Sequence, residues 1–151
     1  MKKLVLAALL ATFAAGASAA DKISFGVSAT YPPFESLDAS NKIVGFDIDL
    51  ATALCKQMQA DCTFTNHAFD SLIPALKFKK YDAVISGMDI TPERSKQVAF
   101  TQPYYANSAL VIAKKDTYKT FADLKGKRIG MENGTTHQKY LQDKHPEVKT
   151  V

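Results

Sequence analysis

An alternation of strand and helix signals over residues 22–87 constrains the fold of this chain more than any other feature. The strand signals cover residues 22–27, 62–65 and 82–87. Apolar residues at helical spacing fill the two gaps, ending near Met58 in the first gap and starting at Asp70 or Ser71 in the second. Strands that alternate with helices in this way build right-handed βαβ units, so the sequence predicts an α/β fold with a parallel sheet.

A second unit is expected after a polar break at Lys114–Asp116. An apolar strand is predicted at Ser108–Ala113, before the break, and a strand at 128–131 and a helix from about Thr135 to Asp143 are predicted after it. One complete strand cannot finish an α/β lobe, so we expect the chain to be incomplete within its second lobe. The expected divisions are a leader over 1–19, a first lobe over 20–108, and a crossover strand with the start of a second lobe over 109–151.

The first nineteen residues are typical of a secretory signal peptide. Lys2 and Lys3 form a positive start, an apolar run covers residues 4–15, and Gly16–Ala19 supplies the small residues of an A-x-A cleavage site. The apolar run is shorter than the roughly 20 residues that a membrane-spanning helix needs. We therefore expect export and a mature chain that begins at Ala20.

Composition excludes several other classes of protein. With 46% hydrophobic and 23% charged residues, the chain has the composition of a globular protein and not of a disordered or coiled-coil one. Without Lys2 and Lys3, 17 basic residues face 15 acidic ones, which leaves a net charge of +2. This small, evenly spread excess does not indicate a nucleic-acid partner.

The chain has two cysteines, Cys55 and Cys62. In an oxidising compartment an even and close pair favours a disulfide over two free thiols. The spacing does not fit C-x-x-C redox chemistry, and no second Cys/His pair completes a zinc site, so no metal is expected. A disulfide at these positions would join the end of the first helix to the next strand.

Arg94 is the most informative residue of the loops where a ligand is expected. Open parallel sheets bind ligands at the carboxyl ends of their strands, and the loops predicted there cover residues 28–35, 67–70, 86–94 and 132–138. Thr91 and Pro92 predict a helix start that places Arg94 in the first turn, where a cation opposes the helix dipole. A planar guanidinium there could clamp a carboxylate, or it could be a surface arginine paired with a neighbouring acid.

Two further pairs of residues have both a binding and a structural interpretation. Tyr31 and Phe69 leave different strand ends and could hold a flat cation between their ring faces, or they could be core aromatics beside turns. Thr135 and Thr136 follow Gly134 and open a helix. They could form an anion site with the free N–H groups of the first turn, or simply cap the helix.

Catalysis finds little support in these loops. Glu35, Asp89 and Glu132 are loop acids that could meet a ligand cation or be solvated. The three histidines have no metal-ligand spacing, no catalytic nucleophile stands out, and one glycine at a helix start is far short of a nucleotide-binding fingerprint. We therefore expect no catalytic residue and no cofactor.

Several segments, in order along the chain, resemble one family. They are Tyr31–Glu35, Gly45–Leu50, Phe69–Leu76, Asp89–Arg94, Leu124–Gly130 and Asn133–Thr136. The whole chain resembles the periplasmic polar-amino-acid-binding proteins of ABC importers, and its arginine-binding members above all, through Met88–Arg94 and Asn133–Lys139. The resemblance implies a two-lobed type II periplasmic-binding-protein fold that closes on a hinge, here truncated within the second lobe.

The same resemblance implies capture of L-arginine between the lobes and delivery to the importer's membrane subunits, by a monomer in the periplasm. The residues implied at the ligand are Tyr31, Phe69, Ser86, Gly87, Asp89, Arg94, Thr135, Thr136 and His137. Arg94 would hold the α-carboxylate with the help of the helix start at Thr135 and Thr136, and the two aromatic rings would enclose the side chain. Ser86 or the Gly87 carbonyl would hold the α-ammonium group, and the two cysteines match a disulfide of the family.

Three departures from the family pattern bear on this expectation. Ser28 stands where the lysine/arginine/ornithine-binding relatives have an aspartate that meets the side-chain cation, so selectivity must come from elsewhere, such as Asp89 or Glu132. His137 stands where those relatives have glutamine. The family's second-lobe aspartate, which pairs with the α-ammonium group, lies beyond Val151.

Two alternative functions use the same fold. An exported enzyme of the cyclohexadienyl dehydratase type would need a general acid or base in the cleft, for which only His137 and the loop acids qualify. A sensor that signals without transport would use the same ligand chemistry.

Overall fold

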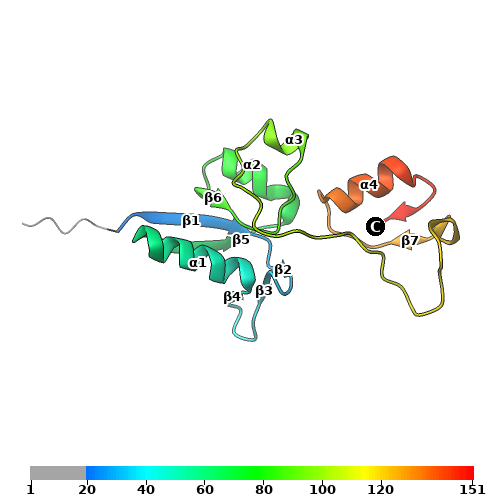
Figure 1. Cartoon of the computed structure of the whole chain (residues 1–151), viewed down its shortest axis with the longest axis horizontal. Coiled ribbons are helices and arrows are strands. Elements are labelled where there is room, and N and C mark those ends of the chain that lie inside the picture. Colours follow the sequence, from blue (N-terminus) through cyan, green and yellow to red (C-terminus); the bar gives the residue numbers. More distant parts are fainter. Residues whose placement is uncertain (1–19) are drawn as a thin grey trace, which may run out of the picture.

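A three-stranded parallel sheet, on the left in Figure 1, forms the centre of the N-terminal part of the molecule. The computed structural model describes residues 20–151, so the signal peptide predicted for 1–19 lies outside the described part. The middle strand is β1 (Lys22–Val27), which pairs with β5 (Asp61–Asn66) and β6 (Ala83–Val84). The predicted βαβ order is confirmed. Within the described residues β6 is a short edge strand and not the buried middle strand that its apolar sequence indicated.

Helices cover both faces of this sheet (Figure 1). They are α1 (Phe46–Met58) and α2 (Leu72–Lys77), the latter preceded by a 3₁₀ turn, η1 (Phe69–Ser71). The predicted side-chain cap of α2 is not formed, because the Ser71 hydroxyl donates instead to the Asp70 carboxylate at 3.1 Å.

The alternation of side chains along β1 explains the two faces. Phe25 and Val27 are buried against Ile48 of α1. Gly26 lies between them and points to the opposite face, where a Cβ atom would be 2.3 Å from the Cζ of Tyr81. Tyr81 packs against α2, and its hydroxyl donates to the Leu72 carbonyl at 2.7 Å. Only glycine therefore fits at position 26.

The predicted disulfide between Cys55 and Cys62 is present and joins α1 to β5, with 6.1 Å between the two Cα atoms. Replacing both cysteines by alanine should lower the free energy of unfolding by about 2–3 kcal/mol, because the unfolded chain loses a short covalent loop. Urea unfolding of both proteins measures the loss. Dithiothreitol should destabilise the wild-type protein and leave the variant unchanged. Equal stability of reduced and oxidised wild-type protein would contradict the prediction.

A small antiparallel sheet between β1 and α1 was not predicted. Its strands, in order, are β2 (Thr30–Tyr31), β3 (Glu35–Leu37) and β4 (Ile43–Val44). The chain before β3 also caps α1, since the carbonyls of Pro33 and Phe34 accept the N–H groups of Phe46 and Asp47, each at 3.0 Å. This sheet brings Tyr31 and Glu35 to the carboxyl end of β1.

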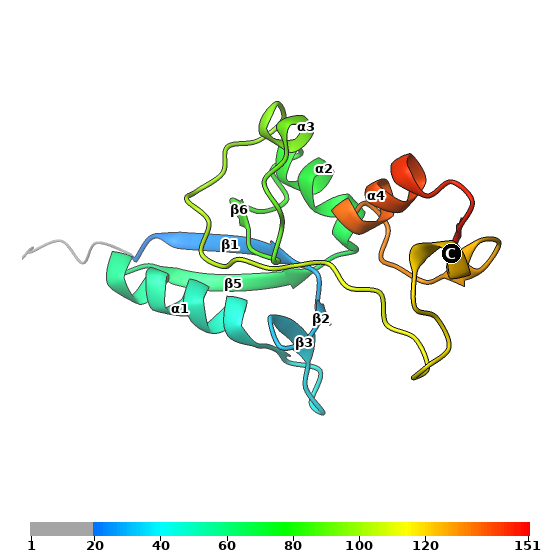
Figure 2. The same ribbon diagram turned by 45° about the vertical axis from the view of Figure 1, so that its right-hand side comes forward.

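The remaining elements follow along an extended chain. They are α3 (Pro92–Ser95), η2 (Phe121–Leu124), β7 (Arg128–Ile129), α4 (Thr136–Lys144) and β8 (Lys149–Thr150). β7 and β8 pair in parallel and α4 lies between them in the sequence, so these three elements form a βαβ unit. α4 lies apart from α2 in Figure 1 and overlaps it more closely in the turned view of Figure 2, and the loop before α4 meets the η1 turn, since a Cβ atom at Gly134 would lie 2.8 Å from Cβ of Asp70.

The strand predicted at Ser108–Ala113 is wrong for this structure. These residues form no strand, and Leu110 and Ile112 are 85% and 92% exposed. Apolar residues predict a strand only where a neighbouring strand accepts them, and within the described residues none lies beside this segment. No helix within 20–151 is both long and apolar enough to span a bilayer.

Candidate ligand-binding site

Arg94 is held where α3, η1 and the start of α4 meet. The Thr91 hydroxyl accepts the Arg94 N–H at 3.2 Å, which confirms the predicted cap of α3. The guanidinium donates through Nη1 to the Asp89 carbonyl at 2.7 Å and through Nη2 to the Gly134 carbonyl at 2.9 Å. Its Cζ atom lies 5.4 Å from the centre of the Phe69 ring, a cation–π contact. Arg94 therefore joins two distant parts of the sequence.

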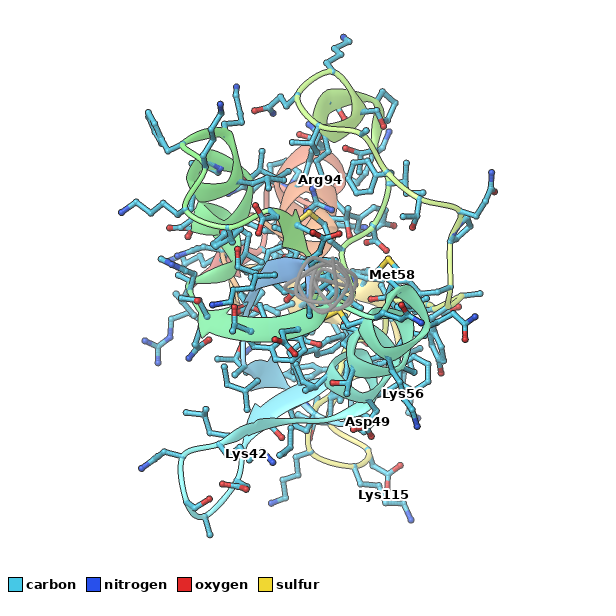
Figure 3. All side chains as sticks on the ribbon, turned by 90° about the vertical axis from the view of Figure 1, so that its left-hand side faces the viewer. Lys42, Asp49, Lys56, Met58, Arg94 and Lys115 are labelled. Atoms are coloured by element: carbon cyan, nitrogen blue, oxygen red, sulfur yellow. A yellow bond between two sulfur atoms is a disulfide. The ribbon has the colours of Figure 1, made fainter. Side chains whose placement is uncertain are left out.

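The Arg94 guanidinium forms no salt bridge with an acidic side chain of the described residues. Among residues 20–151 the structure has two salt bridges, and neither involves Arg94, so the predicted alternative of a surface ion pair is wrong. Burial lowers the pKa of Arg94 and the charge of Asp89 opposes this shift, but an arginine remains protonated at neutral pH. In Figure 3 Arg94 lies toward the middle of the view, whereas Lys42 and Lys115 are at its margin.

The first turn of α4 faces Arg94 across a hollow of about 320 Å³. The Thr135 hydroxyl accepts the N–H of Gln138 at 3.2 Å and so caps the helix. The Thr136 hydroxyl donates to Asp89 Oδ2 at 2.5 Å. The N–H groups at the start of a helix have no partner within the helix. The N–H groups of Thr136 and His137 remain available to a ligand. A guanidinium and the helix N-terminus opposite it can together hold one carboxylate.

A second set of contacts joins the loop before α4 to the end of β1. Glu132 Oε1 accepts hydrogen bonds from the hydroxyls of Ser28 and Thr30, each at 3.0 Å. Gly134 approaches the η1 turn so closely that a Cβ atom there would lie 2.8 Å from Cβ of Asp70. The φ of +76° at Gly134 also favours glycine. The loop acids Asp89 and Glu132 thus serve as acceptors between the two parts of the chain.

Other predicted residues line a separate cavity of about 450 Å³, to which Tyr31, Ser86, Gly87 and Asp89 contribute. The Ser86 hydroxyl is buried and turned inward, where it accepts the N–H of Ser28 at 3.0 Å and donates to Glu35. The Tyr31 ring lies over Gly87, so that a Cβ there would be 3.3 Å from Tyr31 Cε1.

Tyr31 and Phe69 each already contact another side chain of the protein on one ring face. Tyr31 stacks on Phe34 with ring centres 5.1 Å apart, and Phe69 lies beneath Arg94. Each ring is therefore covered on one side by a protein group. The side chain of His137 is exposed and lines neither of the two cavities described above.

Three residues beneath this site were missed or misread. Glu35, a loop acid predicted either to meet a ligand cation or to be solvated, is 1% exposed, and Asp47, which lies in the segment Gly45–Leu50, is 0% exposed. The Tyr104 hydroxyl donates to Asp47 Oδ2 at 2.9 Å, and the same oxygen accepts the Gly87 N–H at 2.8 Å. Burial first and Asp47 second raise the pKa of Tyr104. No sequence signal links these residues, which the small sheet and α1 bring together.

The described residues contain no group of three or more histidine, cysteine, aspartate or glutamate side chains that could hold a metal ion.

This fold and site define a type II periplasmic binding protein, a class with two α/β lobes. The family described as bacterial extracellular solute-binding proteins, family 3, matches residues 23–149. The chain belongs to this family.

Two individual proteins show how similar the chain is to known amino-acid-binding proteins. The chain is 87% identical to the ABC transporter arginine-binding protein 1 of Escherichia coli over 151 residues, which are 100% of this chain and 62% of that protein. It is 47% identical to the histidine-binding periplasmic protein of Salmonella typhimurium, covering 93% of this chain and 56% of the relative. The chain thus spans about three fifths of the length of the relatives it matches.

Solved structures share the fold. A Salmonella typhimurium periplasmic binding protein, described for its high arginine specificity, superposes with a TM-score of 0.85 and 64% identity, covering 87% of this chain and 59% of that one. An ancestral amino acid-binding protein, described as a precursor of cyclohexadienyl dehydratase, superposes with a TM-score of 0.79 and 36% identity over 86% of this chain and 60% of that one.

Proposed function

We propose that the protein is the solute receptor of an ABC amino-acid importer and captures L-arginine. The observation that carries this proposal is Arg94, a guanidinium without an acidic partner that faces the N-terminus of α4 across one hollow. A free α-carboxylate is the group that this pair fits, because the guanidinium fork and the helix N–H groups both favour an anion. Relatives that are described as arginine-binding support the choice of amino acid.

The remaining residues are proposed to select the side chain and hold the ammonium group. The free faces of Tyr31 and Phe69 would contact the ligand guanidinium by cation–π interaction. The Gly87 carbonyl would accept a hydrogen bond from the α-ammonium group, since the Ser86 hydroxyl is already bonded to Ser28 and Glu35. Asp89 would complete the floor, and Thr135, Thr136 and the N–H of His137 would complete the carboxylate site.

The finer organisation follows the same proposal. Residues 1–19 would direct export to the periplasm, where the disulfide forms. Residues 20–108 would form the first lobe, and 109–151 the crossover and the start of the second. The protein would act as a monomer, pass arginine to the importer's membrane subunits, and catalyse no reaction.

Calorimetric titration of the mature full-length protein with L-arginine tests the proposal, with L-lysine and L-glutamate as comparators. Tight binding of arginine is expected, with weaker binding of lysine, whose compact ammonium gains less from the two rings. Glutamate should not bind. If no amino acid binds, the receptor function is refuted, and turnover of cyclic dienols would then favour the enzyme of the dehydratase type.

A further inference from the structure

A buried pair of acids lies beneath the floor of the proposed site. Glu35 of β3 is 1% exposed and Asp47 of α1 is 0% exposed. One oxygen of each carboxyl accepts hydrogen bonds. Glu35 Oε1 accepts one from the Ser86 hydroxyl, and Asp47 Oδ2 accepts one from the Gly87 N–H and one from the Tyr104 hydroxyl. The other oxygens, Glu35 Oε2 and Asp47 Oδ1, are buried with no donor.

A single shared proton would give both unpaired oxygens a partner. The two carboxyl groups are bonded to adjacent residues, Ser86 and Gly87, and Asp47 is the side chain that hydrogen-bonds to protonated Glu35. The number of hydrogen-bond donors indicates that Asp47 carries the negative charge, because its other oxygen receives two hydrogen bonds and that of Glu35 receives one. An ionised pair would bury two adjacent negative charges, which is far costlier.

We infer that Glu35 is protonated and donates to Asp47, and that this acid pair positions the Gly87 turn that forms the floor of the arginine site. The inference rests on the proposed function for its effect on binding. Gly87 has a φ of +51°, and its N–H donates to Asp47 Oδ2 at 2.8 Å and to the Tyr104 hydroxyl oxygen at 3.1 Å. Loss of the shared proton would force the carboxylates apart and release this N–H and the Tyr104 hydroxyl.

The electrostatics around Glu35 agree with the geometry. Burial is the largest cause that raises the pKa of Glu35 to about 8, the Ser86 hydrogen bond opposes it, and Asp47 and Glu132 raise it further. The ionisable groups that face the pair are thus Glu132 from the loop before α4 and Tyr104 from the extended segment, together with the pair itself. None of them is a cation that would favour the ionised form.

The sign of the effect on stability follows from this shift. Between pH 4.5 and about 8 the folded protein keeps a proton that the unfolded chain loses, so the free energy of unfolding falls as the pH rises through this range. A glutamine at position 35 keeps the donor and the shape but does not titrate. The melting temperature of Glu35→Gln minus that of the wild type should therefore increase, by about 3 °C or more, from pH 5.5 to 8.5.

Arginine affinity of the full chain at pH 7 and pH 9 tests the positioning role. Only the protonated fraction would bind well, so the wild-type Kd should rise about 10-fold more between these pH values than that of Glu35→Gln. The ligand's own ammonium also titrates in this range, but it affects both proteins equally. Glu147→Gln, which removes an exposed carboxylate elsewhere, should behave as the wild type. Equal pH dependence in the wild type and Glu35→Gln would overturn the inference.

A carbon-13 titration of the glutamate carboxyl groups separates this inference from the proposed function. One signal should titrate near pH 8 and be missing in Glu35→Gln, and the Gly87 amide signal should shift over the same range. This readout needs no ligand and no variant to detect the raised titration. If every glutamate titrates below about pH 6, the inference is refuted even where arginine binds. If arginine does not bind but the signal appears, the proposed function alone fails.

Discussion

Replacing Arg94 by alanine is expected to abolish binding of every amino acid, because the carboxylate shared by all of them loses its clamp. Truncating one partner of a buried charge pair costs about 2–5 kcal/mol, so the arginine Kd should rise at least about 30-fold and up to several thousand-fold. Arg94→Lys should fall in between, since a lysine keeps the charge but not the two-pronged fork that reaches the Asp89 and Gly134 carbonyls. Calorimetry with L-arginine measures both.

Arg128→Ala is the matched control for this experiment. Arg128 is the other arginine of the sequence, lies in β7 and is exposed. Its removal changes the net charge by the same amount but leaves the hollow beside Arg94 intact, so arginine affinity should stay within about twofold. Circular dichroism should show that all three variants are folded. An Arg94→Ala protein that binds arginine as tightly as the wild type would show that the carboxylate site lies elsewhere.

Removing the aromatic rings should weaken arginine binding in two distinguishable ways. Tyr31→Ala should raise the arginine Kd about 10-fold or more and leave the affinity for small amino acids nearly unchanged, because the ring contacts only the ligand side chain. Phe69→Ala should weaken all ligands and arginine most, because this ring also supports the Arg94 guanidinium at 5.4 Å. Titrations with L-arginine and with a small neutral amino acid separate the two effects.

Tyr118→Ala serves as the control for the tyrosine. Tyr118 is 38% exposed, as is Tyr31, but lies in the extended segment before η2. It should not affect binding. The proposed role of the rings would be refuted if Tyr31→Ala weakened arginine and small amino acids to the same extent.

The parts of the fold that were predicted are those in which the signal is local. The β1–α1–β5 unit follows from side-chain alternation and helical spacing within single segments, and the cap at Thr91 places Arg94 with three residues of context. The small antiparallel sheet was missed because strands of two or three residues carry no measurable period.

The parts that were not predicted depend on contacts between segments far apart in the sequence. Glu35 is a charged residue in a predicted loop, and only the fold places it against Asp47 and Ser86. The ring contacts are of the same kind, since Phe34 stacks on Tyr31 and the Arg94 guanidinium lies over Phe69. Residue types at strand ends predict where a site lies but not which side chains meet in it.

The contacts that join the start of α4 to the first sheet are hydrogen bonds among hydroxyls, carboxylates and backbone carbonyls. Each of these bonds has a charged partner and contributes about 1.5–3 kcal/mol net, and water can replace each of them when the interface opens. This polar interface can open without exposing a buried apolar core, unlike the packed faces on either side of β1. A bound solute that contacts both parts of the chain can then decide which state prevails.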